Sequence, residues 1–304
     1  MYDLAVIGGG PGGVAAGVYA ARKKIKTIFI TESFGGQSVV SDDIHNWIGT
    51  KSIAGWELAQ NLENHLKVYK EDLDIKEGRR IYEVLRKETG GFLLKTQSGE
   101  EFEAKNILIA SGSRHKKLEV PGEKEFDGKG VAYCSTCDAP IFRGKDVAVV
   151  GGGNAGAEAV LDLLPYASKI YWLVRSDIKA DAITAEKAKQ SPKVQILQGV
   201  SVAEIGGGAF VEYLNYKDSA SQLSRLEVGG VFVEIGATPN SDFVKNLVSL
   251  DGRGHIMVDH KTFLAAPGIW AVGDVCDSLY KQNNISAGEG VVALLNIYDK
   301  LIKE

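Results

Sequence analysis

One glycine-rich pattern occurs twice in this chain, each time between an apolar segment and an alanine-rich one. Gly8-Gly-Gly10-Pro11-Gly-Gly13 follows a strand predicted over 3–7, of which 4–7 are apolar, and Gly151-Gly-Gly153-Asn154-Ala155-Gly156 follows the apolar run 147–150. A turn of this kind between a strand and a helix offers backbone amides to the pyrophosphate of a dinucleotide. Two copies of one strand-turn-helix unit therefore predict two nucleotide-binding domains.

Each copy continues with a helix and a second apolar strand, predicted over residues 14–22 and 27–31 and again over 157–164 and 170–174. Glu32 follows the strand of the first copy, about 20 residues after the glycines, where an acidic side chain accepts hydrogen bonds from ribose hydroxyls. In the second copy Val174 and Arg175 stand near this place. An acid there favours NADH and an arginine cluster favours NADPH. The pattern leaves that choice open, and it also leaves open a duplicated fold that binds no nicotinamide.

The rest of the chain predicts further elements and the domain order. We expect a helix over 53–69, a strand over 226–235, and a last helix from about Ala287 to Lys303. Near 236–239 the chain is predicted to return to the first domain. The fold class is thus α/β, with two Rossmann-like dinucleotide-binding domains: a discontinuous domain of residues 1–117 and 238–304, and an inserted domain of residues 118–237.

A pair of cysteines lies between the two glycine patterns. Cys134-Ser-Thr-Cys137 is followed at once by Asp138. In a protein of βαβ units that is not secreted, this spacing indicates a redox-active pair, whose thiol pKa neighbouring groups can lower. Structural zinc needs four ligands, and the only other cysteine, Cys276, is expected to be a buried apolar residue. Asp138 is placed to handle a proton of the thiols, or to cap a helix, and the two roles are compatible.

Composition excludes several classes of function. The net charge of −4 gives no electrostatic footprint for nucleic acid. No stretch is as long as a membrane helix, and the N-terminus lacks the basic region of a signal peptide. Three cysteines do not make a secreted disulfide framework, so a cytoplasmic location is expected.

Further short motifs occur in a fixed order around these features. They are Phe34-Gly-Gly36-Gln37, Ile44-His-Asn46-Trp, Ala110-Ser-Gly112, Val120-Pro-Gly122, Ile235-Gly-Ala-Thr-Pro-Asn240, Gly273-Asp274, Tyr280-Lys281-Gln282 and Ala287-Gly-Glu-Gly290. With this ordered set the chain resembles the low-molecular-weight thioredoxin reductase family along nearly its whole length. It is most similar in motifs to the reductase core of the alkyl hydroperoxide reductase flavoprotein subunit.

The resemblance implies two cofactors, their binding residues and the roles of the thiols. FAD would be bound by Gly8, Gly10, Pro11, Gly13, Glu32, Gly36, Gln37, Asn46, Ala110, Gly112, Gly273, Asp274, Lys281, Gln282 and Ala287. NADPH or NADH would be bound by Gly151, Gly153, Asn154, Ala155, Gly156, Glu158 and Arg175. The resemblance further implies a homodimer in which Cys137 lies next to the flavin, Cys134 attacks a protein disulfide, and Asp138 donates a proton.

The function that follows is reduction of thioredoxin or of a thioredoxin/glutaredoxin-like protein by NAD(P)H through FAD and the dithiol. Because the chain begins at the FAD strand, we expect this disulfide partner to be a separate protein. Both the dithiol and the nicotinamide must reach the flavin, so we also expect rotation of the domains about connectors near 116–123 and 236–239. Three alternatives remain: ferredoxin or another electron donor in place of a nicotinamide, a flavin NAD(P)H oxidase, and a redox- or nucleotide-sensing module without catalysis.

Overall fold

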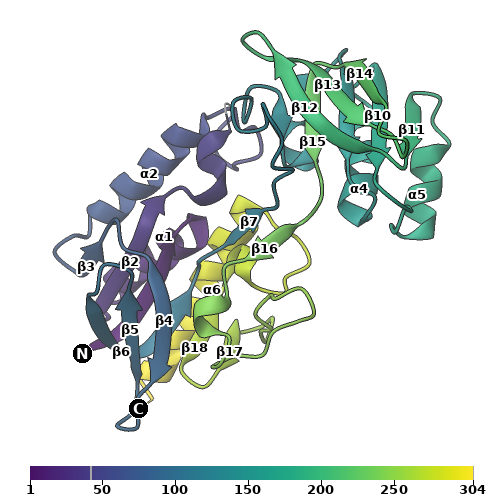
Figure 1. Cartoon of the computed structure of the whole chain (residues 1–304). Coiled ribbons are helices and arrows are strands. Elements are labelled where there is room, and N and C mark those ends of the chain that lie inside the picture. Colours follow the sequence, from purple (N-terminus) through teal and green to yellow (C-terminus); the bar gives the residue numbers. More distant parts are fainter. Residues whose placement is uncertain (42, 304) are drawn as a thin grey trace. The chain divides into compact units, whose positions relative to one another are not determined.

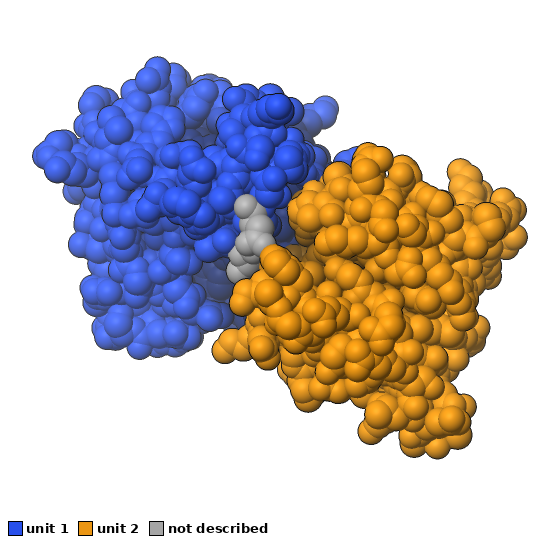
Figure 2. All heavy atoms as spheres, turned by 90° about the horizontal axis from the view of Figure 1, so that it is seen from above, with its two compact units in different colours: residues 1–114, 238–304 blue, residues 115–237 orange. Residues whose placement is uncertain are grey.

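The computed structural model describes residues 1–41 and 43–303, which divide between two compact units (Figures 1 and 2). Unit 1 consists of residues 1–114 and 238–304, and unit 2 of residues 115–237. The divisions thus fall at 114/115 and 237/238, whereas the sequence suggested 117/118 and 237/238. The mixed α/β architecture with parallel sheets confirms the predicted fold class.

Unit 1 is built on a mostly parallel sheet with an apolar core on each face. Its order is β17-β18-β6-β1-β2-β3, and β5 pairs antiparallel with β6 and with β4. The strands are β1 (Tyr2–Gly9), β2 (Thr27–Phe34), β3 (Leu73–Lys76), β4 (Ile81–Arg86), β5 (Phe92–Thr96), β6 (Glu101–Ile109), β17 (Leu264–Ala266) and β18 (Ile269–Ala271). Side chains alternate between the two faces, so Leu4 and Val6 belong to one buried cluster and Ala5 and Ile7 to the other.

The helices of unit 1 are α1 (Pro11–Arg22), α2 (Gly55–Lys67) and α6 (Asn283–Leu301), with short 3₁₀ turns η1 (Gly36–Val40), η3 (Asp242–Val244) and η4 (Gly273–Val275). Helices α1 and α6 approach closely because glycines meet at their contact: a Cβ on Gly290 would lie 2.2 Å from the Gly12 carbonyl oxygen. Helix α6 begins at Asn283 rather than at Ala287. No helix in the described part of the chain is both long and apolar enough to cross a membrane.

Unit 2 contains a five-stranded parallel sheet and a three-stranded antiparallel one. The parallel sheet has the order β11-β10-β9-β15-β8. The elements are β8 (Val131–Ala132), α3 (Ser135–Asp138), η2 (Ala139–Phe142), β9 (Asp146–Val150), α4 (Asn154–Leu163), β10 (Lys169–Val174), α5 (Ala182–Lys189), β11 (Val194–Gln198), β12 (Ser201–Gly207), β13 (Val211–Lys217), β14 (Leu223–Glu227) and β15 (Gly230–Val233). Strands β12, β13 and β14 form the antiparallel sheet.

The single strand predicted over 226–235 is wrong, because the chain changes sheets within it. The Val228 amide still donates to Glu212 beside β13, whereas the next amide, of Gly229, donates to Asp146 at the start of β9. Two glycines permit the change of partner: a Cβ on Gly230 would lie 2.2 Å from the ring of Phe142. The apolar pattern predicted strand structure but carried no sign of the new pairing.

The two segments that carry the chain between the units pair with each other. Strands β7 (Ser113–His115) and β16 (Ala237–Pro239) form a two-stranded sheet, and the Lys116 amide donates to the Gly236 carbonyl oxygen (2.9 Å). Most of the predicted connector 116–123 is fastened within unit 2. The buried Glu123 carboxylate accepts the amides of Leu118 (2.8 Å) and Glu119 (2.7 Å).

Candidate active site

The residues predicted to bind FAD follow the ends of neighbouring parallel strands in unit 1. Gly10 follows β1, Ala110 follows β6, Asp274 follows β18, and Glu32 lies near the end of β2. These four strands are adjacent and parallel, so their carboxyl ends share one edge of the sheet. That edge is where open α/β sheets bind ligands.

Gly8, Gly10 and Gly13, the glycines at the pattern positions of the first turn, have different structural roles. Gly8 has φ +117°, and a Cβ there would lie 2.2 Å from the Ala110 carbonyl oxygen. A Cβ on Gly13 would lie 1.9 Å from the Gly8 carbonyl oxygen. A Cβ on Gly10 would meet nothing within 4 Å among the described residues. The outer glycines are thus required by the turn and by helix packing, while the middle one leaves its backbone open to a pyrophosphate, and the turn fits FAD.

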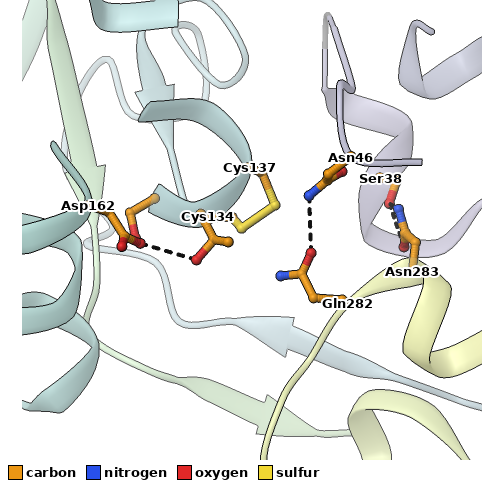
Figure 3. Close-up of a disulfide and its surroundings, with 9 residues drawn as sticks. Ser38, Asn46, Cys134, Cys137, Asp162, Gln282 and Asn283 are labelled. Atoms are coloured by element: carbon orange, nitrogen blue, oxygen red, sulfur yellow. Dashed lines mark hydrogen bonds between the residues drawn. A yellow bond between two sulfur atoms is a disulfide. The ribbon is translucent and has the colours of Figure 1, made fainter. Parts of the chain in front are cut away.

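Two loops of unit 1 hold the other predicted flavin residues. Gly36 has φ +61°, and a Cβ on it would lie 3.7 Å from the Gly10 Cα atom. Gln37 Nε2 donates to the Ser113 carbonyl oxygen (2.6 Å), next to Gly112. Asn46 Nδ2 donates to Gln282 Oε1 (3.1 Å), as Figure 3 shows. The chain thus brings Gln37 to the segment at 112–113 and Asn46 to Gln282.

The second loop continues into the start of α6. Asn283 and Ser38 are hydrogen-bonded through their side chains, as Figure 3 also shows. Lys281 Nζ donates to the Cys276 carbonyl oxygen, and Ala287 lies in the first turns of α6. Glu32 remains exposed: 65% of its side chain is accessible, and its Oε2 lies 3.8 Å from Arg80 Nη1.

Glu289 belongs to the motif at 287–290, but the sequence did not suggest that it supports the turn at Gly273. It is buried on α6, and its Oε2 accepts the Gly273 amide (2.6 Å) while its Oε1 accepts the Ser278 hydroxyl (2.8 Å). These bonds hold the turn at Gly273, whose φ is +75°, and so position Asp274. No local pattern signalled this contact, because its two partners lie in separate elements.

The second glycine turn, in unit 2, repeats the geometry of the first. Gly151 has φ +144°, and a Cβ there would lie 2.1 Å from the Glu234 carbonyl oxygen. A Cβ on Gly156 would lie 2.1 Å from the Gly151 carbonyl oxygen, whereas one on Gly153 would meet nothing within 4 Å of the described chain. The buried Trp172 also helps: its Nε1–H donates to the Gly151 carbonyl oxygen (2.7 Å). The turn therefore fits a second nucleotide.

Some of the predicted residues around this turn support its backbone, and the others are exposed to solvent. Val174 is buried and packs beneath the turn, since a Cβ on Gly152 would lie 2.6 Å from its Cγ1. Asn154 Oδ1 accepts the amide of Asp181 (2.8 Å) and so holds the loop after β10. Arg175 is exposed at the end of β10. Ala155 and Glu158 are exposed on the first turns of α4.

Cys134 and Cys137 form a disulfide at the end of β8, with their Cα atoms 5.3 Å apart (Figure 3). The single helical turn between them is fixed to α4. The hydroxyls of Ser135 (2.9 Å) and Thr136 (3.1 Å) both donate to Asp162 Oδ2. Both cysteines are partly exposed, as a redox-active pair requires.

Asp138, the last residue of α3, is half-buried and occupies the N-cap position of the 3₁₀ helix η2. Its side chain makes no capping hydrogen bond to that helix. Asp138 therefore stands where a capping residue would stand, but its side chain does not cap the helix. The third cysteine, Cys276, is buried in unit 1, and burial raises the pKa of its thiol.

Glu234 was not predicted as a site residue, and it lies between the second glycine turn and the disulfide. Strand β15, which it follows, pairs with β9 on one side and with β8 on the other. Burial, reinforced by the negative charges of Asp162, Asp138 and Glu158, raises the pKa of Glu234 to about 8 against the opposing hydrogen bond from the Ser135 amide. No local pattern could have revealed it, because its neighbours are distant in the sequence.

A sequence profile described as "Pyridine nucleotide-disulphide oxidoreductase" matches residues 2–290. The chain belongs to this family. It is 40% identical over 306 residues to an alkyl hydroperoxide reductase protein of Pseudomonas putida, an alignment covering 99% of this chain and 58% of that protein. It is 38% identical over 304 residues to "NADH dehydrogenase" of Bacillus subtilis, covering 99% of this chain and 59% of that protein. The chain thus spans somewhat more than half the length of these curated relatives.

Solved structures agree with this placement. Thioredoxin reductase from Streptococcus pyogenes superimposes with a TM-score of 0.93 at 31% identity, covering 100% of this chain and 99% of that one. The resemblance inferred from the ordered motifs is confirmed. Proteins of this family are oxidoreductases that use FAD and NAD(P)H, and the two open glycine turns fit two such nucleotides.

Proposed function

We propose that the protein uses electrons of NADPH or NADH, with FAD as cofactor, to reduce the disulfide of a thioredoxin or a thioredoxin/glutaredoxin-like protein at Cys134 and Cys137. The observation that carries the proposal is the Cys134–Cys137 disulfide itself, held at the same sheet edge as the second glycine turn. A binding module or an oxidase has no evident use for a disulfide in that place. The similarity to a solved thioredoxin reductase supports an electron-transfer role for the pair.

Each nucleotide would be held mainly by backbone groups. In unit 1 the amides at the start of α1 would bind the pyrophosphate of FAD, Glu32 the ribose, and Asp274 the ribityl chain. In unit 2 the amides at the start of α4 would bind the pyrophosphate of the nicotinamide nucleotide. When bound, FAD supplies a two-electron carrier suited both to hydride donors and to disulfides.

The dithiol transfers its electron pair by exchange. The thiolate of Cys134 attacks one sulfur of the substrate disulfide, the substrate S–S bond breaks, and the leaving sulfur takes a proton. Cys137 then attacks the mixed disulfide, which restores the Cys134–Cys137 bond and releases the reduced substrate. Asp138 directly follows Cys137 and is assigned the proton needed in this exchange. Ser135 and Thr136 orient the turn through Asp162.

The electron donor depends on the residues after β10. Val174 is buried under the glycine turn, so Arg175 is the charged group that we assign to the nucleotide. A single exposed arginine gives weaker selection for a 2′-phosphate than a cluster does, and we expect both NADPH and NADH to reduce the protein. Failure of both would instead favour ferredoxin as the donor.

The dithiol must serve a cofactor and a protein substrate in turn, so we also propose that unit 2 moves relative to unit 1 during turnover. The chain crosses between the units at residues 114/115 and 237/238, which are the positions for such a hinge. A chemical crosslink between the units should abolish turnover without releasing FAD. The homodimer expected from the resemblance is part of the same proposal, and the mass of the protein in solution tests it.

An anaerobic titration tests the function directly. The purified protein should be yellow, and stepwise addition of NADPH or NADH should bleach the flavin absorbance. Adding a thioredoxin should then restore the absorbance in the wild-type protein and in Cys276→Ser, but not in the double variant Cys134→Ser/Cys137→Ser. A colourless preparation, or a double variant that reduces thioredoxin at the wild-type rate, would overturn the proposal.

A further inference from the structure

Glu234 combines three features that its position in unit 2 makes significant. Its Oε1 atom is buried and has no hydrogen-bond partner in the described part of the chain. Its carboxyl group accepts the amide of Ser135, the residue that follows Cys134. Its strand, β15, is the direct neighbour of β8, which leads into the disulfide. The carboxyl group of Glu234 thus lies next to the turn that carries the cysteine pair.

Three negative charges from two other elements act on Glu234. Asp138 acts on it from α3, and Glu158 and Asp162 act on it from α4, while its neighbour from the β9 turn is the uncharged Gly151. Three carboxylates and a buried position disfavour a fourth negative charge. A neutral carboxyl group also leaves a buried oxygen unpaired at lower cost than a carboxylate does. Glu234 is therefore held in its protonated form at neutral pH in the disulfide state.

From this arrangement we infer that Glu234 holds a proton for the cysteine pair: above neutral pH it takes up a proton when the disulfide is reduced and releases it when the dithiol is oxidised. The inference rests on the proposed function of Cys134 and Cys137 as a redox pair. Glu234 acts through the turn at Ser135, so it is a positioning and proton-holding group rather than one that attacks substrate.

The step balances in electrons and protons. Above about pH 8 the oxidised protein carries a disulfide and a largely ionised Glu234. A reductant, reduced flavin in the enzyme or dithiothreitol in the test, supplies two electrons and breaks the S–S bond. Two protons are taken up, one by a cysteine thiol and one by Glu234, which leaves one thiolate. The thiolate replaces the negative charge of Glu234, so the total charge of the cluster does not increase.

This exchange keeps the nucleophile ionised. A thiolate beside an ionised Glu234, Asp138 and Asp162 would be opposed by all three charges, and its proton affinity would rise. Neutralising Glu234 lowers that opposition. The dithiol can then retain the thiolate that attacks the substrate disulfide.

The test compares the reduction equilibrium of the cysteine pair in two proteins across pH. Wild-type holoenzyme and Glu234→Gln are equilibrated anaerobically with fixed ratios of reduced and oxidised dithiothreitol over a pH range from about one unit below to about two units above neutral. The thiols are then alkylated, and mass spectrometry gives the fraction of Cys134–Cys137 that is reduced. The reduction equilibrium constant of the variant is divided by that of the wild type at each pH. The pH dependence of dithiothreitol cancels in this ratio, because it is the same for both proteins.

The expected result is a ratio that is constant well below the pKa of Glu234 and rises above neutral pH. At high pH the ionised Glu234 of the wild type opposes reduction, and the glutamine does not. If reduction raises the proton affinity of Glu234 by about one pKa unit, the ratio increases about fivefold between about pH 7 and about pH 9. The control Glu227→Gln removes an exposed carboxylate on β14 that pairs with Arg225, and its ratio should not change with pH.

A ratio that does not change with pH would overturn the inference, whether that constant value is one or not, because a purely structural effect gives a constant factor. Glu234→Ala removes the same charge and serves as the second variant if the glutamine variant does not fold. The measurement uses neither nicotinamide nor thioredoxin. A rising ratio without thioredoxin reduction would therefore refute only the proposed function, and a flat ratio with normal turnover would refute only the role of Glu234.

Discussion

Replacing the middle glycine of the first turn separates binding of FAD from stability of the fold. In Gly10→Ala the new methyl group meets nothing within 4 Å in the described chain, and the backbone at φ −76° and ψ 179° accepts alanine. The loss of backbone freedom in the unfolded chain stabilises the variant by about 0.4–1 kcal/mol, and the poorer N-cap costs a similar amount. The free energy of unfolding of the apoprotein should thus change by less than about 1 kcal/mol.

The same methyl group should weaken FAD binding strongly. It occupies the space through which the backbone approaches the pyrophosphate, so the dissociation constant for FAD should rise at least about tenfold, which is about 1.4 kcal/mol. The assays are urea unfolding of the apoprotein and titration of the apoprotein with FAD, followed by flavin fluorescence. Gly252→Ala is the matched control, since its Cβ also meets nothing within 4 Å of the described residues. It should leave the affinity for FAD unchanged and alter the free energy of unfolding by no more than about 1 kcal/mol.

Replacing Gly13, at the end of the same turn, should instead lower the stability of the fold. In Gly13→Ala the Cβ would lie 1.9 Å from a backbone oxygen, where distances under 3.0 Å essentially never occur. Helix α1 must shift, at a cost of about 1–3 kcal/mol or more in the free energy of unfolding.

Wild-type affinity of Gly10→Ala for FAD would refute the assignment of this turn to the pyrophosphate. A loss of several kcal/mol in its apoprotein would refute the open geometry.

Two further predictions concern unit 2. The pKa of Glu234 rises from 4.5 in the unfolded chain to about 8, so its stabilising effect is complete below pH 4.5 and is lost as pH rises towards 8. Urea unfolding curves at several pH values give the free energy of unfolding of Glu234→Gln minus that of the wild type. This difference should increase over the window by up to about 5 kcal/mol and then stay level. A difference independent of pH would contradict the assigned pKa. Trp172→Phe leaves the buried Gly151 carbonyl oxygen without its indole donor, so the free energy of unfolding should fall by about 1–3 kcal/mol. Calorimetry should also show weaker binding of the nicotinamide nucleotide. Unchanged values of both would show that this hydrogen bond does not hold the turn.

The sequence alone determined the elements whose cause is local. Gly13 and Gly156 follow from a short-range rule, because a Cβ on either would strike the carbonyl oxygen of Gly8 or Gly151 in the same turn. The strands before and after these turns follow from uninterrupted apolar runs, and the Cys134–Cys137 pair follows from spacing. These features were enough to predict the fold class and the family resemblance.

The tertiary structure decided which of these elements are neighbours. The apolar run over 226–235 predicted one strand, yet Gly229 and Gly230 let the chain leave one sheet and insert β15 between β9 and β8. That insertion places Glu234 beside a cysteine pair from a distant part of the sequence, and α6 likewise places Glu289 beneath Gly273. Burial and charge then set the protonation of Glu234. Strand order depends on the balance of packing over a whole sheet, which no local pattern of residues records.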